Sequence, residues 1–260
     1  MKIKKAAIVY MKHGTKEHLS CIKYAKSELE KRNILFGFYA RENLSFSKLS
    51  GKDLIVVVGG DGTFLKASHF IEGNQIIFGI NSDPDNKEGF FLRTFKKDFV
   101  KKLELILKGK AEISKLARLE SKIGNTKIPL SLNEIFVGDA KPYRMSYYFV
   151  KIGKQKEWQR SSGILVSTPA GTYAWASSAA CTKLPLLSDR FEIVAREPYI
   201  RRLVKKKSEC RILGKKDSVE IISDMDHAIA VVDSISKTYK MKYRHKISIK
   251  LSNKPLNVVF

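Results

Sequence analysis

Short apolar runs alternate with amphipathic stretches along the first hundred residues. Within the segment 17–33, apolar side chains recur at the spacing of one helical face, at Leu19, Ile22, Ala25 and Leu29. The pattern predicts strands at 6–11, 35–40, 53–58 and 75–80, and helices at 17–33, from about Phe64, and at about Lys96–Leu107. Short apolar strands interleaved with helices favour a parallel sheet with helices on both faces.

The pattern changes near residue 110, where helical stretches become rare. The strand-like segments that follow are 127–137, 145–153, 163–168, 218–224, 228–234 and 245–251. We therefore expect an α/β N-terminal domain with a Rossmann-like parallel sheet at 1–110, and a β-rich C-terminal domain at 111–245.

Composition places the chain among ordered globular proteins, because 43% of its 260 residues are hydrophobic. No stretch approaches the roughly 18 apolar residues that span a bilayer, and the apolar run after the basic start is too short for a signal peptide. We expect a cytoplasmic protein that has no contact with membranes. Cys21, Cys181 and Cys210 lie far apart without a CxxC spacing, which favours reduced, buried cysteines over structural disulfides.

Basic residues outnumber acidic residues by 49 to 26, which gives a formal charge of +23. Such an excess indicates either an anionic partner or a lysine-rich solvated surface. The lysines are scattered from Lys2 to Lys254, and only the segment 201–207 is dense. Because no nucleic-acid-binding motif accompanies the charge, we expect no specific nucleic-acid partner.

The stretch VVVGGDGTFLKAS, residues 56–68, reads as a strand, a glycine turn and a helix. Gly59, Gly60 and Gly62 carry no Cβ and tolerate positive φ, so their amides can approach an anion closely. Thr63 is a candidate cap for a helix whose N-terminus also favours negative charge. The stretch is neither a Walker A sequence nor a GxGxxG fingerprint, and an ordinary glycine-rich turn is the alternative.

Asp61 lies in the middle of this loop, where a carboxylate would repel bound phosphates. Repulsion is avoided if Mg²⁺ neutralises the phosphates of a nucleotide and a hydroxyl proton lies between the groups. An aspartate that accepts the proton of an attacking hydroxyl fits phosphoryl transfer from Mg·ATP. Asp83 and Asp85 could suggest a metal site, but Pro84 between them favours a turn.

GGDGT occurs in a superfamily of NAD kinases, 6-phosphofructokinases and lipid kinases. Other segments of the sequence distinguish these families. Two motifs of NAD kinases resemble LNEIFVGD at 132–139 and SSGILVSTPAGTYAWASSA at 161–179. Two shorter family segments resemble GIN at 79–81 and AVVDS at 230–234. The chain thus resembles the NAD kinase family over nearly its whole length. NSDP at 81–84 resembles the branch of mitochondrial-type and plant NADH-kinase-like members.

The resemblance implies ATP-dependent phosphorylation of the 2′-hydroxyl on the adenosine ribose of NAD, or of NADH, in a homodimer or tetramer. It also implies that the segment at about 246–260 returns to the first domain. Asp61 matches the family's proposed base. The residues that match the family's phosphate loop are Gly59, Gly60, Gly62 and Thr63. The positions that match dinucleotide contacts are Phe90, Asn133, Glu134, Ser162, Thr168, Tyr173, Ala174, Trp175, Ser178 and Asp233.

The chain departs from the family pattern at Ser162, which stands for an aspartate, at Tyr173, which stands for a small residue, and at Ala180-Cys181, which stand for two glycines. Loss of the aspartate removes attraction for the cationic nicotinamide of NAD and favours NADH. Two alternatives stay open. One is a lipid or sugar kinase of the same superfamily, and the other is a catalytically weak protein that binds nucleotides or, through its basic surface, nucleic acid.

Overall fold

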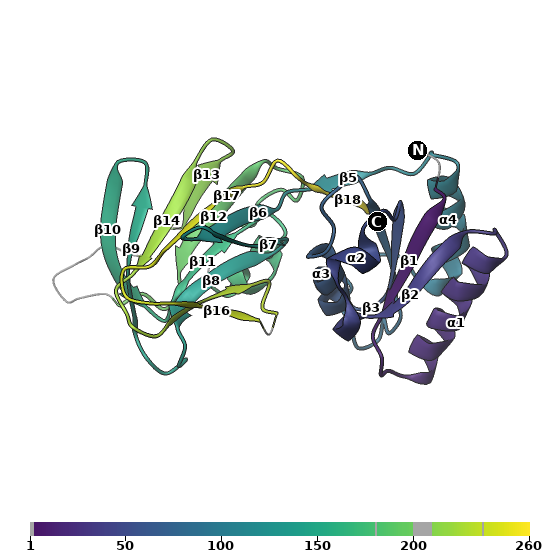
Figure 1. The fold of residues 1–260 in the computed structure, drawn as a ribbon, viewed down its shortest axis with the longest axis horizontal. Coiled ribbons are helices and arrows are strands. Elements are labelled where there is room, and N and C mark those ends of the chain that lie inside the picture. Colours follow the sequence, from purple (N-terminus) through teal and green to yellow (C-terminus); the bar gives the residue numbers. More distant parts are fainter. Residues whose placement is uncertain (1–2, 180, 200–209, 236) are drawn as a thin grey trace. The chain divides into compact units, whose positions relative to one another are not determined.

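The computed structural model describes residues 3–179, 181–199, 210–235 and 237–260 (Figure 1). Ala180 and the basic segment 201–207 lie outside the described residues. The chain divides into two compact units, which are Met1–Lys115 with Leu256–Phe260, and Leu116–Pro255. The first is an α/β unit with a parallel sheet and the second is β-rich, so the predicted fold class is confirmed.

The first unit is built on a six-stranded sheet in the order β2-β1-β3-β4-β18-β5. Its strands are β1 (Lys5–Tyr10), β2 (Leu35–Ala40), β3 (Leu54–Gly59), β4 (Ile76–Asn81), β5 (Ser114–Leu116) and β18 (Leu256–Val259). The pairs β1–β2, β1–β3, β3–β4 and β4–β18 are all parallel. β3 and β4 are buried along their whole length, as expected for strands covered on both faces.

Helices cover both faces of this sheet. They are α1 (Lys16–Glu30), η1 (Arg41–Asn43), α2 (Phe46–Leu49), α3 (Asp61–Ser68), η2 (Lys96–Asp98) and α4 (Phe99–Leu107). α1 and α4 share one apolar cluster with alternate residues of β1, β3 and β4, so these two helices cover the same face. α3 packs on β1 and β3. No helix in the described ranges is both long and apolar enough to cross a membrane.

The strand β18 enters the first sheet after the chain has passed through the whole second unit (Figure 1). Its register pairs Val258 with Ile77 of β4. The return begins later than expected, because β17 (Lys246–Leu251) pairs with two strands of the second unit. Residues 246–255 therefore lie in the second unit, where the alternating burial of β17 fits its antiparallel neighbours.

The second unit contains two antiparallel sheets of six strands, in the orders β10-β9-β14-β17-β6-β7 and β13-β12-β11-β8-β15-β16. The first adds to β17 the strands β6 (Leu119–Ile123), β7 (Thr126–Ser131), β9 (Ser146–Ile152), β10 (Gln155–Ser161) and β14 (Ser218–Ser223). The second contains β8 (Glu134–Asp139), β11 (Ile164–Ser167), β12 (Arg190–Ala195), β13 (Arg211–Gly214), β15 (Ala228–Val232) and β16 (Thr238–Met241). One apolar core takes alternate residues from both sheets, so they pack face to face.

Two short 3-10 helices, η3 (Gly171–Tyr173) and η4 (Trp175–Ala179), follow β11. The expectation of reduced cysteines is wrong for one pair, because Cys181 and Cys210 form a disulfide with their Cα atoms 5.7 Å apart. The linear spacing of 29 residues concealed this pair, which the chain brings together beside β12 and β13. Cys21 is free and buried, as expected.

Candidate functional site

The glycine loop joins β3 to α3, and its helix begins earlier than the sequence suggested. Gly60 is the N-cap and Asp61 is the first helical residue, so Thr63 lies inside the first turn. The prediction that Thr63 caps the helix is therefore wrong. Its buried hydroxyl instead accepts a hydrogen bond from Arg41 of η1 at 3.3 Å, which brings a cation to the loop.

The glycines of this loop matter for the space they leave. Among the described residues with positive φ, Gly59, Gly60 and Gly62 do not appear, and Gly60 is extended at φ −130°. A Cβ on Gly59 would lie 2.8 Å from the Thr63 hydroxyl, and one on Gly60 would lie 2.8 Å from the Lys87 side chain. A Cβ on Gly62 would meet nothing closer than 3.9 Å. Close packing, and not backbone conformation, favours glycine at position 59, whereas at position 60 the flexible Lys87 side chain would have to move aside.

Asp61 connects this loop to the segment that follows β4. Its two carboxylate oxygens accept the backbone N–H groups of Phe90 and Phe91 at 3.0 and 2.9 Å. Gly89 precedes these amides at φ +68°, in the left-handed region that glycine adopts freely. Each oxygen still has a lone pair for another donor. The structure thus holds a partly exposed carboxylate in a fixed orientation at the start of a helix.

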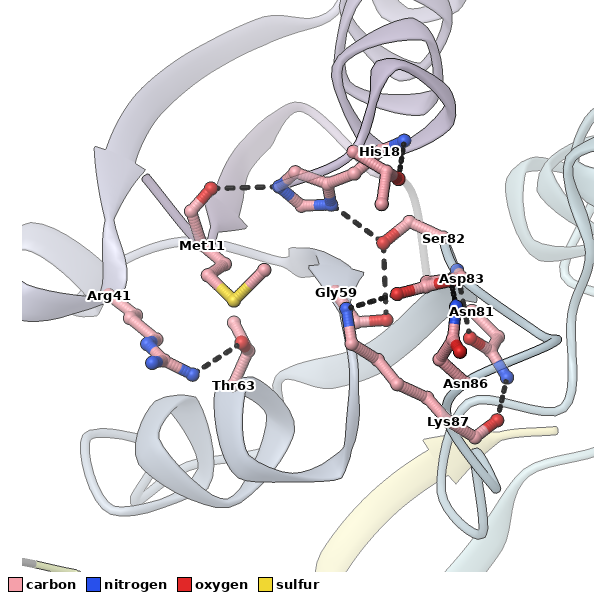
Figure 2. A network of polar contacts seen from close by, with 11 residues as sticks. Met11, His18, Arg41, Gly59, Thr63, Asn81, Ser82, Asp83, Asn86 and Lys87 are labelled. Atoms are coloured by element: carbon pink, nitrogen blue, oxygen red, sulfur yellow. Dashed lines mark hydrogen bonds and ion pairs between the residues drawn. The ribbon is translucent and has the colours of Figure 1, made fainter. Parts of the chain in front are cut away.

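A buried histidine that the sequence analysis missed lies behind the loop (Figure 2). His18 of α1 is fully buried, with Nε2 2.8 Å from the Met11 carbonyl oxygen and Nδ1 2.6 Å from the Ser82 hydroxyl. Because a carbonyl only accepts, Nε2 carries a proton. The Ser82 amide donates to the Gly59 carbonyl at 3.2 Å. His18 therefore links the residue after β1 to the residue after β4, and its place on the buried stripe of α1 was the available signal.

The residues after β4 form a turn, as predicted for Asp83 and Asp85. Asp83 accepts a hydrogen bond from Asn86 at 2.9 Å and pairs with Lys87 at 3.4 Å (Figure 2). The Asn86 hydrogen bond, followed by Lys87, lowers the pKa of Asp83. Lys87 was not predicted as a site residue, although its side chain lies against Gly60. It adds a second cation to the glycine loop.

A hollow of about 570 Å³ in the first unit lies beside this turn and not at the glycine loop. Asn81, Asp85 and Lys96 are among its lining residues. No predicted site residue lines it. We place the candidate chemistry at Asp61 because the fixed carboxylate, the glycines and the two cations meet there.

In the second unit, Asp233 organises the bend between β7 and β8. Its carboxylate accepts hydrogen bonds from the Ser131 hydroxyl at 2.6 Å and from three successive amides, of Leu132, Asn133 and Glu134, at 2.9, 2.7 and 3.2 Å. Asp233 is only 3% exposed. The structure therefore gives it the role of holding Asn133 and Glu134 in place.

The pair Asn133 and Glu134 leaves two acceptors without partners. Asn133 Oδ1 and Glu134 Oε2 are buried and have no hydrogen-bond partner among the described residues. Burial, and then the charge of Asp233, raises the pKa of Glu134 to about 8. Ser234, at φ 52° where the family has glycine, donates its hydroxyl to Glu134 Oε1 at 3.1 Å. Buried acceptors without partners indicate a place where a ligand supplies the donors.

Thr168 forms its hydrogen bonds with the protein itself. It is fully buried, donates to the Leu132 carbonyl at 2.5 Å and accepts the Gly171 amide at 3.1 Å. A Cβ on Gly171 would collide with the Asn133 backbone. The segment after β11 is thereby fixed against the Asn133–Glu134 bend.

The remaining predicted residues of the long motif follow this anchor. The Trp175 ring stacks on Phe136 with centroids 5.1 Å apart, and the Arg196 guanidinium lies 4.7 Å from its centroid, which favours the packing role. Ser178 is exposed and donates to the Trp175 carbonyl at 2.8 Å, while the partly buried Ala174 ends η3. Tyr173 is 40% exposed, with Lys183 5.3 Å from its ring.

Ser162 is joined to Arg196 through the backbone. Its amide donates to the Arg196 carbonyl at 3.0 Å, and Arg196 pairs with Glu197 at 3.1 Å. Phe90, in the first unit, is partly buried and has the Arg93 guanidinium 5.4 Å from its ring. Asp61, the glycines, Thr63 and Phe90 thus gather in the first unit, and the other predicted residues gather in the second.

Residues 4–111 match the family model described as the ATP-NAD kinase N-terminal domain. A probable NADH kinase of Oryza sativa is 30% identical over 215 residues, which cover 74% of this chain and 66% of the rice protein. The NADH kinase of Arabidopsis thaliana is 26% identical, over 73% of this chain and 67% of that protein. The NAD kinase of Methanothermobacter thermautotrophicus is 29% identical, over 70% and 62%. The matched region thus spans about two thirds of these relatives.

Two solved structures share the fold. An NAD kinase from Archaeoglobus fulgidus in complex with ATP superposes with a TM-score of 0.81 at 23% identity, over 98% of this chain and 93% of that one. Yeast NADH kinase complexed with NADH also gives a TM-score of 0.81, at 16% identity, over 100% of this chain and 84% of that one. At these identities the likeness establishes the fold.

Proposed function

The chain belongs to the NAD kinase family, and from this premise we propose that it transfers the γ-phosphoryl group of ATP to the 2′-hydroxyl of the adenosine ribose of NAD or NADH. The observation that carries the proposal is the Asp61 carboxylate, fixed by the Phe90 and Phe91 amides at the glycine loop. The same relatives do not favour the lipid kinase and sugar kinase alternative.

The phosphates of ATP would lie at the start of α3. The first amides of a helix have no intrahelical acceptor, so those at Asp61 and Gly62 are oriented toward an anion. Arg41, at Thr63, and Lys87, at Gly60, lie at the loop as cations that phosphates could share with their present partners Glu42 and Asp83. Mg²⁺ would enter with ATP and neutralise its phosphate oxygens, so that the Asp61 carboxylate could lie beside them without repulsion.

Asp61 would act on the acceptor hydroxyl. An aspartate is too weak a base to ionise an alcohol beforehand, so the proton moves to its carboxylate while the phosphoryl group is transferred. The O–H bond breaks as the new O–P bond forms, and the bond from the γ-phosphorus to the bridging oxygen breaks to release ADP. The rigid hold of the two amides keeps the carboxylate aligned during this step.

The dinucleotide would satisfy the buried acceptors of the second unit. A ribose hydroxyl or a carboxamide N–H would donate to Asn133 Oδ1, and a ribose hydroxyl, which can both donate and accept, would pair with Glu134 Oε2. Ser162, which stands where the family has an aspartate, presents no carboxylate to the nicotinamide, and this favours the neutral ring of NADH over the cationic ring of NAD. The assembly into a homodimer or tetramer and the cytoplasmic location stay predictions.

A coupled assay tests this function directly. Purified protein is supplied with Mg·ATP and either NAD or NADH, and NADP or NADPH is detected with a specific dehydrogenase. Product that depends on all three components is expected, with kcat/KM higher for NADH. Absence of product with both acceptors would contradict the proposed activity, whereas a strong preference for NAD would contradict only the role of Ser162.

A further inference from the structure

We propose that Cys181, Cys210 and Glu192 form a thiol–disulfide exchange site, in which the Glu192 carboxyl group carries the proton and the substrate class is a dithiol reductant. The site lies on the second unit, on residues that the phosphoryl transfer described above does not use. The proposal therefore does not depend on the proposed function.

The three side chains meet at one point beside the edge of a sheet. The sulfurs of Cys181 and Cys210 and one carboxylate oxygen of Glu192 all lie within 4.8 Å of one another. Glu192 belongs to β12, which is flanked by β11 and β13. Its neighbours Phe191 and Ile193 face the core between the two sheets, so Glu192 points to the opposite face, where the disulfide lies.

Glu192 has no structural partner that explains its burial. It is fully buried, and neither carboxylate oxygen has a hydrogen-bond partner among the described residues. A buried carboxyl group without partners is costly, so a fold-stabilising role alone would be better served by an apolar residue. One of the two carboxylate oxygens lies within 4.8 Å of both sulfurs, so the disulfide is the reactive group beside it.

Burial raises the pKa of Glu192 to about 7. A carboxyl group in this range is present in both protonation states near neutral pH, so it can give a proton and take one back. The sulfurs are accessible to a reagent, because Cys181 and Cys210 are only partly buried. The arrangement thus combines a partly buried electrophilic bond with a carboxyl group beside it that can carry a proton.

The exchange balances with an external dithiol as reductant. A thiolate of the dithiol attacks one protein sulfur, the Cys181–Cys210 bond breaks, and the leaving thiolate takes the proton of Glu192. The second thiol of the reductant attacks the mixed disulfide and releases the other protein sulfur. The reductant becomes a cyclic disulfide, its two protons end on Cys181 and Cys210, and Glu192 is reprotonated in the process.

Opening this bond would affect η4. The cysteines belong to one small cluster with Trp175, Ala176 and Ala179 of η4. The disulfide ties Cys181, two residues after η4, to Cys210, the residue before β13. Reduction would release this tie, and the resulting effect on dinucleotide binding is a consequence that rests on the proposed function.

Thiol counting on the wild-type protein tests the bond itself. Air-oxidised, denatured protein is alkylated before and after treatment with dithiothreitol and is weighed by mass spectrometry. One alkyl group, on Cys21, is expected before reduction, and three are expected afterwards. Three groups before reduction, or a stoichiometric zinc ion retained by the two thiols, would overturn the proposal.

Reduction kinetics test the proton carrier. The rate of thiol release by dithiothreitol near pH 7 is compared for the wild type, Glu192→Gln, Glu192→Asp and the exposed control Glu112→Gln. Glu192→Gln should slow reduction by about 100-fold or more, which is the lower end of the range for a positioned acid. Glu192→Asp should recover part of the rate, and the control should match the wild type. A Glu192→Gln rate within about twofold of wild type overturns the role of Glu192.

Discussion

Asp61 in the first unit and Glu134 in the second differ in which groups form hydrogen bonds to their carboxyl oxygens. Asp61 in the first unit is anchored by two amides of its own chain, and it remains partly exposed. Glu134 in the second unit is buried, and one of its oxygens has no partner among the described residues. The first arrangement is prepared before any ligand arrives, whereas the second is completed by a ligand. The predictions below separate these two kinds of site.

The largest effect is expected from Asp61→Asn. The amide cannot accept the proton of the acceptor hydroxyl, so kcat should fall by about 100-fold or more. The three glycines of the loop, Arg41 and Lys87 are unchanged in this variant, so the Kd for ATP measured by calorimetry should change little. Near-normal turnover would remove Asp61 from the proposed chemistry, and loss of ATP binding would show that its main role is to anchor the loop.

Asp233→Ala should destabilise the protein strongly. It leaves the Ser131 hydroxyl and three amides without their acceptor, and unsatisfied buried donors cost about 1–3 kcal/mol each. The free energy of unfolding in urea should fall by about 3 kcal/mol or more. Asp189→Ala, at an exposed position, is the control and should stay close to wild type. Equal stabilities would show that Asp233 does not hold the bend.

Glu134 should make the ligand-free protein less stable as pH rises. Its pKa is raised from 4.5 to about 8, so the folded state binds more protons than the unfolded state between these values. Its contribution is complete below about pH 4.5 and is lost as pH passes through about 8, with a slope of at most about 1.4 kcal/mol per pH unit. Glu192 contributes with the same sign. Glu134→Gln should flatten the stability profile between pH 5 and 8, and an unchanged profile would contradict the raised pKa.

The smallest effect concerns the glycines of the loop. Gly62→Ala has open space and a helical position, so it should stabilise the protein by about 0.5–1 kcal/mol. Gly59→Ala would press on Thr63 and should destabilise by about 1 kcal/mol or more. Opposite signs in thermal unfolding would confirm that spacing decides which glycine is required. Equal losses would indicate that the backbone conformation matters at both positions.

Local pattern was sufficient for most of the fold. The apolar runs predicted β1, β3 and β4, because strands covered on both faces are apolar along their length. The prediction of β2 rested on apolar residue types, although this edge strand is exposed or half-buried along most of its length. The helix boundaries differ from the predicted ones. The start of α3 was missed because its N-cap, Gly60, has no side chain that signals a cap. The first helix ends at Glu30, three residues before the left-handed Asn33. Long-range pairing could not be read locally, which is why the limits of β18 and the Cys181–Cys210 disulfide were missed.

The candidate site was predicted by residue but not by partner. Asp61 was singled out from its place among glycines, yet the amides that hold it come from residues about thirty positions later. Thr63 was assigned as a cap from its residue type, although the helix begins at Asp61 with Gly60 as its N-cap. His18 escaped notice because one polar residue on an apolar helical face becomes informative only when its contacts are known.

The late return of β18 has a consequence for biosynthesis. A ribosome makes β1 to β4 early, but the strand that pairs with β4 on the far side from β3 appears only after the whole second unit has been translated. Until then the nascent sheet has an open apolar edge at Ile77, where Val258 will pair. Synthesis order thus couples completion of the first unit to production of the second, and nascent chains halted before Leu256 should depend on chaperones.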